Sequence, residues 1–423
     1  MKFLILGTLI LSLFFPENVH AREHYNYSET YAVIVGVLKW QDTGLTTYSE
    51  RFRKDKELYL LLIKKGVKPE NILFLEDSHA TLKNIKAGLK KIIARAGANS
   101  TFIFYYEGHG LNREGTYYFA NYDIQTDNVE QTGFSVNFLT RYLYSHFKGK
   151  KAIFMGDCCY SGSLKIVSEK LSSRGILSVT LTSSDANNTS TSNWTFTQSI
   201  IDSLSGNPLA DRNRDGVITF GEMVEEAKDA MRFRERQRYG FYSHRFPQEM
   251  VMALPRQRNN THAGSSQYRP GQYIEGLYQG GYQPARITGF TATEAICEFY
   301  FYSEKIIRKL ALNQIRTIHF NRFPAGTDVN VVWQDRIYPA RIQQEADGFH
   351  FITYPGWGNH WDEWVMDNRI VQGEFIYVKW QGKWYPAKIL KKEGNRYFIT
   401  YIGWPNRWDE WVTAERMRFN NRR

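Results

Sequence analysis

Two cysteines and one histidine in this chain have the surroundings that nucleophilic catalysis needs. The cysteines, Cys158 and Cys159, are adjacent in the stretch "FMGDCCYSG", and His109 stands between two glycines in "EGHG". A cysteine nucleophile requires a thiolate, a base within hydrogen-bond reach and N–H donors for the developing oxyanion. The glycines let the backbone approach a substrate closely, and the N–H of Gly110 is available as a donor. We therefore expect His109 to act on one of the two thiols.

Both stretches follow short apolar runs that predict buried strands, and helical segments separate these runs. The predicted strands are Tyr31–Val37, Asn71–Asp77, Ser100–Gly110, Lys151–Cys159 and Gly175–Ser184, and the predicted helices include Arg51–Lys65, Thr81–Ala96 and Val136–Phe147. This alternation predicts an α/β fold with a mostly parallel central sheet flanked by helices. Chemistry then belongs at the carboxyl ends of the strands, where both stretches fall. Because side chains alternate along a strand, only one of the two cysteines can meet the histidine.

The segment from Tyr31 to about Leu254 resembles the caspase-like cysteine peptidases, nearer to metacaspases and their bacterial relatives than to animal caspases. "FIFYYEGHG" resembles their histidine strand, and "GDCCYSGS" resembles the metacaspase D-x-C-x-S-G stretch. The spacing of 50 residues between His109 and Cys159 is similar to that of caspases. The resemblance implies a caspase-like (caspase-hemoglobinase) fold and endopeptidase activity.

Alignment with the family stretch on Asp157, Ser161 and Gly162 places the nucleophile at Cys159. The resemblance further implies His109 as the base and the backbone N–H groups of Gly110 and Cys159 as the oxyanion hole. Two alternatives stay open at this point. Cys158 can be the nucleophile instead, or the two cysteines can form a vicinal disulfide that abolishes activity reversibly.

The resemblance also implies a substrate specificity, since metacaspases cleave after Arg or Lys. Asp157 matches an acid of their specificity pocket, two residues before the nucleophile. "RFRKDKELYLLL" resembles the family's G-C-x-x-D-A segment and places Asp55 on the second pocket acid, although Phe52 stands where metacaspases have Cys. Two carboxylates would select a basic side chain by charge pairing. The alternative for Asp55 is an ordinary residue on a helix surface.

Two departures from the family pattern support a different function. Glu107 precedes Gly108, and Tyr160 follows Cys159 where metacaspases often have His. The alternative hypothesis is therefore a catalytically inactive caspase-like domain that serves as a binding or scaffold protein.

The stretch "DRNRDGVITFGE" fits the twelve-residue calcium loop of an EF-hand without a gap. Its predicted ligands, which supply carboxylate, amide, hydroxyl and carbonyl oxygens, are Asp211, Asn213, Asp215, Val217, Thr219 and Glu222. Gly216 provides the sharp turn. We predict weak Ca²⁺ binding, at ~10⁻⁴–10⁻³ M, with a structural or regulatory role. The alternative is an Asx-rich turn that is ordered without metal.

The N-terminal stretch has the features of a secretory signal peptide over residues 1–21. Lys2 precedes a short apolar run, Pro16 ends that run, and Val19-His20-Ala21 is a small-residue cleavage site. We expect a secreted or periplasmic protein that is mature from about Arg22, with the caspase-like domain over 22–254 and no membrane partner. The chain has only three cysteines, too few for a framework of structural disulfides. An odd number of cysteines in a secreted chain indicates a reactive thiol.

After a polar linker over residues 255–270, the chain repeats itself. Two copies, 325–370 and 372–418, share the pattern "W…YPA[RK]I…ITY.GW…WDEWV" at a fixed offset of 47 residues, and a looser copy spans 271–320. Short alternating strands in units of this length predict small all-β barrels in tandem. The copies resemble the Tudor-like group (SH3-like chromo-barrel or Tudor-knot units), closely for the last two and weakly for the first.

The resemblance to Tudor-like barrels implies aromatic cages that can hold a methylated lysine through cation–π attraction. The candidate cage residues are Tyr354, Trp357, Trp361, Trp364, Tyr401, Trp404, Trp408 and Trp411. The alternative is that most of these rings fill the barrel cores. The chain carries a net charge of +11, which favours an anionic partner or serves as a solubilising surface. The expected partners are peptide or protein substrates and a protein or polymer ligand of the barrels, with nucleic acid less favoured.

Overall fold

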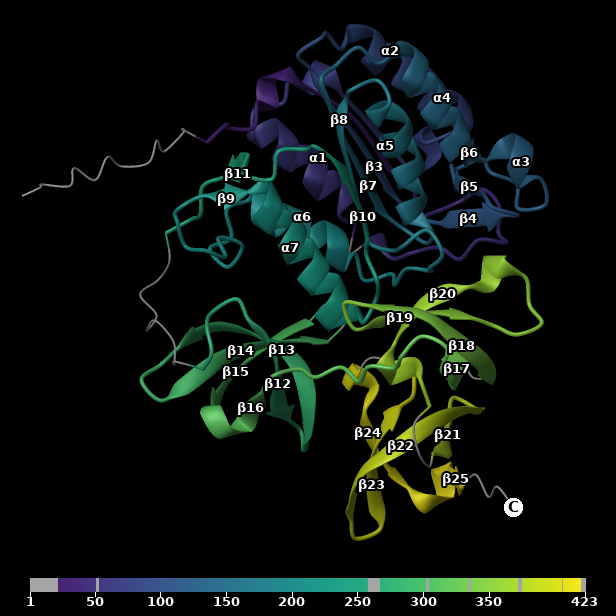
Figure 1. Ribbon diagram of the computed structural model, residues 1–423, viewed down its shortest axis with the longest axis vertical. Helices are drawn as coiled ribbons and strands as arrows, with labels where there is room; N and C mark the ends of the chain where they lie inside the picture. Colours follow the sequence, from purple (N-terminus) through teal and green to yellow (C-terminus); the bar gives the residue numbers. More distant parts are fainter. Residues whose placement is uncertain are drawn as a thin grey trace, which may run out of the picture.

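The computed structural model describes residues 22–50, 53–257, 267–301, 304–333, 336–371, 375–404 and 406–419. The predicted signal peptide, Phe52 and most of the predicted linker lie outside these residues. Figure 1 shows an α/β domain at the top and three small β-sheets below it. Within the described ranges, no helix is long and apolar enough to cross a bilayer.

A six-stranded sheet forms the centre of the α/β domain, and all but one of its neighbouring pairs are parallel. Its strands, in spatial order, are β10 (Gly240–His244), β8 (Leu177–Thr182), β7 (Lys151–Asp157), β3 (Thr101–Glu107), β1 (Thr30–Gly36) and β2 (Ile72–Glu76), with β10 antiparallel to β8. Every residue of β3 is buried because helices cover both faces of the sheet. The predicted α/β class is confirmed.

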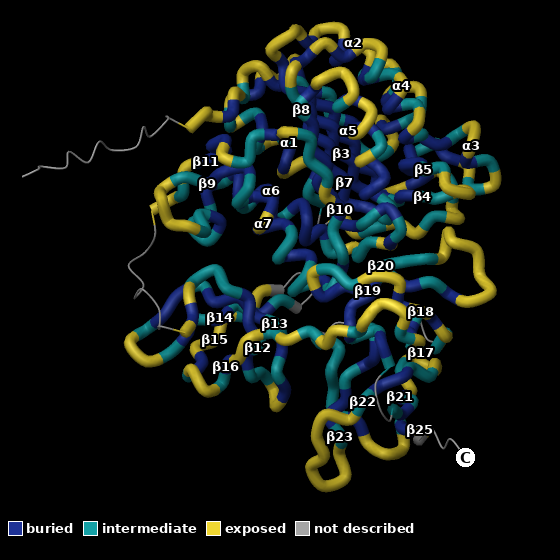
Figure 2. Tube along the Cα trace, in the orientation of Figure 1, coloured by how far each residue is buried: buried dark blue, intermediate teal, exposed yellow. Residues whose placement is uncertain are grey.

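Helices on the two faces of the sheet form two separate hydrophobic cores. One face is covered by α2 (Leu82–Arg95), α4 (Val136–His146) and α5 (Lys165–Ser172), and the other by α1 (Asp55–Lys64), α6 (Thr195–Leu204) and α7 (Phe220–Asp229). The helix α2 shows why these segments form: Thr81 caps its first turn, and Ile85, Leu89 and Ile92 line one buried face. Figure 2 shows the strands β3 and β7 in the buried interior and exposed residues along the outer surface of α2, whereas α6 has no exposed residue.

Two groups of short elements complete the domain. A three-stranded sheet contains β4 (Gly110–Arg113), β5 (Thr116–Phe119) and β6 (Phe134–Ser135), and the one-turn helix α3 (Val129–Thr132) precedes β6. The strand β9 (Ile218–Thr219), which is part of the predicted calcium loop, pairs with β11 (Val251–Ala253).

Each sequence repeat forms one antiparallel sheet. The first contains β12 (Tyr273–Tyr278), β13 (Gly281–Phe290), β14 (Glu294–Phe301), β15 (Glu304–Ala311) and β16 (Ile315–Arg316). The second contains β17 (Asp328–Trp333), β18 (Arg336–Ala346), β19 (Phe349–Thr353) and β20 (Glu363–Met366). The third contains β21 (Ile376–Trp380), β22 (Lys383–Glu393), β23 (Arg396–Tyr401), β24 (Glu410–Thr413) and β25 (Met417–Phe419).

The three sheets share one topology, which is that of a Tudor-like barrel. In the third, Val378 pairs with Met417, and in the second an isolated bridge joins Val331 to Ile370, each 47 residues earlier. The first sheet has the same strand order as the third although its sequence lacks the "WDEW" end. We call the three sheets barrels 1, 2 and 3.

A buried ion pair fixes barrel 1 to the α/β domain. The two terminal guanidinium nitrogens of Arg286 in β13 each lie 2.6 Å from one carboxylate oxygen of Glu226 in α7. The same guanidinium donates to the carbonyl of Leu209, just before the predicted calcium loop, at 3.3 Å. Loss of Arg286 or Glu226 would leave the other as a buried charge without an ion-pair partner. This contact therefore favours one specific arrangement of barrel 1 and the α/β domain.

Candidate active site

The carboxyl ends of β3 and β7 bring the predicted catalytic residues side by side. Glu107 and Asp157 are register partners at the last positions of the two strands. Just beyond them, Gly110 packs on the backbone of Cys159 so closely that a Cβ at Gly110 would overlap the Cys159 carbonyl oxygen. Glycine is therefore required at this position for steric reasons. The two stretches identified in the sequence meet at one edge of the sheet.

The backbone N–H of Gly110 points away from its neighbouring strand. Ala120 donates to the carbonyl of His109 at 2.9 Å, which makes Gly110 and Phe119 a non-hydrogen-bonded pair of the β4–β5 ladder. The N–H of Gly110 therefore makes no ladder hydrogen bond to β5. A donor of this kind, packed against the backbone of the candidate nucleophile Cys159, suits an oxyanion hole.

Hydrogen bonds at both ring nitrogens fix the tautomer of His109. Its Nε2 lies 2.8 Å from the carbonyl oxygen of Thr46, which can only accept, so Nε2 carries the proton. Its Nδ1 lies 2.9 Å from the hydroxyl of Tyr48, which donates to it. Burial lowers the pKa of His109, so the imidazole is neutral at pH 7. Nδ1 is consequently the atom that can accept a proton.

The two cysteines have different environments. Cys158 is 2% exposed and belongs to the hydrophobic core, whereas Cys159 is half-buried. The Sγ of Cys159 accepts a hydrogen bond from the backbone N–H of Ser190 at 3.2 Å. All three cysteines are free thiols, so no vicinal disulfide is present. Burial raises the pKa of the Cys159 thiol, which is therefore protonated at neutral pH.

One premise of the sequence argument is wrong, because strand alternation does not separate the two cysteines. β7 ends at Asp157, and both cysteines lie in the turn that follows it. Tyr160, the next residue, has a left-handed backbone with φ of 57°, and its N–H donates to the carbonyl of Asn188 at 2.8 Å. The turn, rather than the strand, therefore buries Cys158 and leaves Cys159 accessible.

No hydrogen bond joins His109 to Cys159 in the described structure, and Tyr48 holds the imidazole nitrogen instead. The rings of Trp40 and Tyr48 lie 4.5 and 4.7 Å from the His109 ring, measured between centroids. Catalytic hydrogen bonds are often long in the free enzyme and shorten when substrate binds.

The two predicted specificity acids lie at the same edge, and Glu107 joins them. Asp55 begins α1 and fits against Gly36, where a Cβ would overlap its carboxylate. Gly36 is the register partner of Glu107, which in turn is the register partner of Asp157. All three carboxyl groups are buried, with at most 1% of each residue exposed. Asp55 is thus a buried residue of this edge and not a residue on a helix surface.

Short hydrogen bonds connect two of these acids. The hydroxyl of Tyr105 lies 2.7 Å from a Glu107 oxygen and 2.7 Å from the Thr197 hydroxyl, which lies 2.7 Å from Asp157. Tyr105 donates to Glu107, and Thr197 donates to Asp157. Burial raises the pKa of Glu107 well above its usual range, which favours its protonated form. Asp157 accepts hydrogen bonds from both the hydroxyl and the backbone N–H of Thr197.

Asp157 differs from Asp55 in having no basic partner among the described residues, so it is the acid that can pair with a cationic side chain of a substrate. The guanidinium of Arg53 lies 3.6 Å from Asp55 and also pairs with Glu76 and Asp77. Asp157 has hydroxyl and backbone partners in Thr197 and no ion pair with a described basic residue. Burial raises the pKa of Asp157 to about 6, so it is ionised at pH 7.

The predicted calcium loop has ligand chemistry that fits Ca²⁺, but its ligands are partly engaged by the protein. Oδ1 of Asp211 is buried without a hydrogen-bond partner. Arg22 forms an ion pair with Asp215, and both carboxylate oxygens of Glu222 accept hydrogen bonds from backbone N–H groups of the loop. Within the described residues, no three acidic, histidine or cysteine side chains are gathered in a position to hold a metal.

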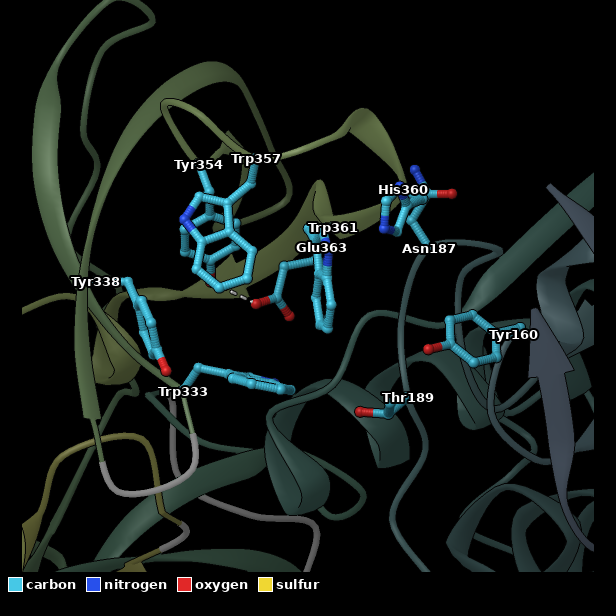
Figure 3. Close-up of a pocket in the computed structure, with 10 residues that line it drawn as sticks. All are labelled: Tyr160, Asn187, Thr189, Trp333, Tyr338, Tyr354, Trp357, His360, Trp361 and Glu363. Carbon is cyan, nitrogen blue, oxygen red and sulfur yellow. Dashed lines mark hydrogen bonds between the residues drawn. The ribbon is translucent and has the colours of Figure 1, made fainter. Parts of the chain in front are cut away.

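The aromatic residues of each repeat divide into two groups. In barrel 2, Tyr354, Trp357 and Trp361 line a pocket together with Trp333 and Tyr338, as Figure 3 shows. In barrel 3, Tyr401, Trp404 and Trp408 form a similar ring cluster with Trp380 and Tyr385, in which Trp404 contacts Trp380 and Tyr401 as well.

The last tryptophan of each repeat lies outside the cage. The Trp364 ring stacks under the Arg238 guanidinium at 3.7 Å from the centroid, and Trp411 packs beside Gly280 of barrel 1. Trp364 and Trp411 therefore pack against a preceding part of the chain and do not belong to the ring clusters.

The segment 187–190 connects the candidate nucleophile to barrel 2. The Asn188 side chain donates to the carbonyl of Trp364 at 2.8 Å and accepts from its N–H at 3.2 Å. Two residues later, Ser190 donates to the Cys159 thiol. The sequence offered no signal for Asn188, Ser190 or Tyr48, because all three lie in loops. The position of Glu107 beside Asp157, by contrast, follows from parallel pairing of two predicted strands.

Comparison with known proteins agrees with this geometry. Residues 55–251 match the caspase domain family, and residues 370–419 match the Tudor-knot family, described as the RNA binding activity-knot of a chromodomain. No curated protein matches the chain.

Two solved structures show low overall similarity to the chain. A Geobacter sulfurreducens protein is 10% identical with a TM-score of 0.37, over 54% of this chain and 100% of its own. The Drosophila initiator caspase Dronc is 9% identical with a TM-score of 0.34, over 60% of this chain and 94% of its own. The assignment rests on the family matches and the topology: the chain consists of a caspase domain followed by Tudor-like barrels, the last of which is a Tudor-knot domain.

Proposed function

We propose that this protein is a cysteine endopeptidase that uses Cys159 as its nucleophile and His109 as its base. The observation that carries the proposal is the contact between Gly110 and the Cys159 backbone, which sets the histidine turn beside the thiol. Cys158 is buried in the core and has no access to a substrate.

In the proposed reaction, the Sγ of Cys159 attacks the carbonyl carbon of the scissile peptide bond while Nδ1 of His109 takes the thiol proton. The N–H groups of Gly110 and Cys159 donate to the oxyanion. The imidazolium then returns the proton to the leaving amine as the C–N bond breaks. Water, deprotonated by the same nitrogen, hydrolyses the thioester and restores the thiol.

The resting site contains a neutral thiol and a neutral imidazole rather than a preformed ion pair. Burial raises the pKa of Cys159 and lowers that of His109, and both shifts favour the uncharged forms. Proton transfer therefore accompanies attack on the substrate. The Tyr48 hydroxyl has to leave Nδ1 for this transfer to occur.

Cleavage after Arg or Lys is the specificity that the charges favour. Asp157 lies two residues before the nucleophile, is ionised at pH 7 and has no ion-pair partner among the described basic residues. A guanidinium or ammonium group would supply that partner. Entry of the side chain requires local opening, since Asp157 is 1% exposed.

The test is covalent labelling with a peptidyl-arginine chloromethyl ketone, followed by mass spectrometric mapping. We expect alkylation of Cys159 in the wild type, strong slowing in His109→Ala, and no labelling in Cys159→Ala. The matched reagent with aspartate in place of arginine should react far more slowly. Faster reaction of the aspartate reagent would contradict the specificity, and alkylation of Cys158 would contradict the assignment of the nucleophile.

A second candidate function is an inactive caspase-like binding protein. The occupied Nδ1 of His109 and the absence of a described His109–Cys159 hydrogen bond favour it. It predicts that the labelling rate of Cys159 is the same in His109→Ala as in the wild type.

We further propose export of the chain and a targeting role for the barrels, with a protein or surface polymer favoured over nucleic acid. Support comes from the signal-like residues 1–21 and from the ring-lined pocket of barrel 2. Expression of the full chain should yield an exported protein whose N-terminal residue is Arg22. Retention of residues 1–21 in the exported protein would contradict cleavage at Ala21.

A further inference from the structure

A pocket with a volume of about 60 Å³ lies where barrel 2 meets the caspase domain. Five aromatic rings of barrel 2 form one side, and three residues of the caspase domain, Tyr160, Asn187 and Thr189, form the other. Figure 3 shows the rings grouped on the barrel side, opposite Tyr160 and Thr189. The pocket is therefore shared between two domains.

The rings of barrel 2 are arranged edge to face, so that several faces are available to one guest. Trp357 and Trp361 meet at 83° with 5.5 Å between centroids, and Trp361 meets Trp333 at 77°. Trp357 is 51% exposed and Trp361 39% exposed, although both are large apolar residues. Exposed aromatic clusters of this kind mark binding sites.

The wall contributed by the caspase domain is continuous with the candidate nucleophile. Tyr160 directly follows Cys159 in the chain, and the neighbouring segment 187–190 binds the Cys159 thiol through Ser190. A guest in the pocket therefore lies next to the backbone that would hold a substrate. The position is that of a substrate subsite rather than of a remote docking site.

Contacts on the far side of β20 keep the two walls together. Asn188 holds the Trp364 backbone with two hydrogen bonds, and the Arg238 guanidinium covers the Trp364 ring. Arg238 also donates to the carbonyl of Ala346 in barrel 2 at 3.4 Å. The pocket is thus preorganised, which lowers the entropic cost of binding.

The chemistry of the pocket favours a cation. Ring faces attract positive charge, and the effect is strongest for tryptophan. The carboxylate of Glu363 also lines the pocket, although Arg369 compensates its charge through two contacts of 2.6 and 2.7 Å. Attraction by ring faces suits weakly hydrated cations, so an alkylated ammonium should bind more tightly than lysine itself.

We propose that this pocket is a second substrate subsite, which binds a cationic side chain of the polypeptide while the scissile bond lies at Cys159. The proposal rests on the peptidase function proposed above and extends its substrate class to polypeptides with two separated basic residues. Asp157 would select the residue at the scissile bond, and barrel 2 would select the second.

Barrel 3 provides the matched control. Trp404 occupies the same position in its repeat as Trp357, and it shares the two ring contacts of Trp357, to the tyrosine of the second strand of its barrel and to the next tryptophan. Arg236 of the caspase domain lines a pocket with Tyr401, but that pocket does not include Trp404, whereas Tyr160 lines the ring pocket of barrel 2 together with Trp357. Trp357→Ala should therefore affect peptide cleavage, and Trp404→Ala should not.

The test uses peptides with one arginine at the cleavage position and a second residue placed at each of several spacings from it. The second residue is norleucine, lysine or trimethyllysine. Binding is measured to the full-length Cys159→Ala protein, and hydrolysis is measured with the wild type. At one spacing, we expect trimethyllysine to bind about five- to thirty-fold more tightly than norleucine. Trp357→Ala should remove this difference, and Trp404→Ala should retain it.

The two proposals fail in different ways. Hydrolysis after arginine with no effect of the second residue at any spacing would overturn the subsite and leave the peptidase intact. An equal loss in Trp357→Ala and Trp404→Ala would also overturn the subsite. Cation-dependent binding to Cys159→Ala without any hydrolysis by the wild type would overturn the peptidase, and the pocket would then be a ligand site of a binding protein.

Discussion

The carboxyl groups of Glu107 and Asp157, at the ends of two neighbouring strands, are joined by three contacts of 2.7 Å through Tyr105 and Thr197. Tyr105 donates to Glu107 and Thr197 donates to Asp157. Burial raises the pKa of Glu107 well above its usual range but that of Asp157 only to about 6, although both acids lie at the same edge of one sheet. At pH 7 this difference leaves Asp157 as a carboxylate that has no ion pair with a described basic residue.

The pH dependence of cleavage after arginine should report the ionisation of Asp157. Burial raises its pKa to about 6, so the carboxylate loses its charge as the pH falls through that value. We expect kcat/KM for an arginine peptide to fall below about pH 6, mainly through KM. A matched peptide with citrulline, which has the same shape without the charge, should show a much smaller loss of binding. Equal pH profiles for the two peptides would exclude charge pairing as the basis of specificity.

Replacement of Asp157 by asparagine should stabilise the protein at neutral pH and abolish the preference for arginine. The folded-state pKa lies above the unfolded value of 3.8, so the stabilising contribution of the protonated form is complete below 3.8 and is lost as the pH rises through about 6. At pH 7.5 the buried charge costs on the order of 2 to 3 kcal/mol, and Asp157→Asn should raise Tm by several degrees.

The control for this prediction is Asp42→Asn, which should lower Tm at neutral pH instead of raising it. Hydrogen bonds from Thr126 and Gly44 lower the pKa of Asp42, so its charge stabilises the fold at neutral pH. Thermal unfolding of both variants between pH 4 and 7.5 measures the two effects. A gain in Tm for Asp157→Asn that does not shrink toward pH 4 would show that its cause is packing rather than ionisation.

The fold of the caspase domain could be predicted from sequence because its strands are continuous apolar runs separated by amphipathic helices. Parallel pairing then brings the strand ends, and with them His109, Cys159 and Asp157, to one edge. The contacts of Tyr48, Asn188 and Ser190 could not be predicted, since loops carry no periodic signal. The sequence also did not show which tryptophans line the ring clusters and which contact another part of the chain. Trp364 and Trp411 are of the same residue type as the tryptophans of the clusters.

Tyr48→Phe should raise the pKa of His109 and shift the acid limb of the kcat/KM profile to higher pH. The hydroxyl donates to Nδ1 and so stabilises the neutral imidazole, and its removal eliminates that stabilisation. The variant also removes the competitor for the proton-accepting nitrogen, so kcat at pH 8 should stay equal or increase. Tyr117→Phe, which alters a nearby hydroxyl without contact to His109, is the control. A loss of kcat at pH 8 in Tyr48→Phe alone would instead make Tyr48 a positioning residue that catalysis needs.

Calcium binding by the loop 211–222 remains a prediction, and Arg22 provides a sharp test of it. Its guanidinium pairs with Asp215 and competes with a cation for that carboxylate. We expect calorimetry to show weak binding by the wild type, at ~10⁻⁴–10⁻³ M, and binding several-fold tighter by Arg22→Ala. Asp211→Ala should bind no calcium. The absence of binding by both the wild type and Arg22→Ala at millimolar Ca²⁺ would identify the segment as a turn that is ordered by its own hydrogen bonds.

The most direct measurement of the central claim compares hydrolysis of one arginine peptide by the wild type, Cys159→Ala and Cys158→Ala. The account predicts that Cys159→Ala has no detectable activity, because the other thiol near the histidine turn, that of Cys158, is buried in the core. It predicts that Cys158→Ala, which shortens a core side chain, loses some stability and retains catalysis at permissive temperature. Activity that survives in Cys159→Ala and is lost in a folded Cys158→Ala protein would contradict the assignment of the nucleophile.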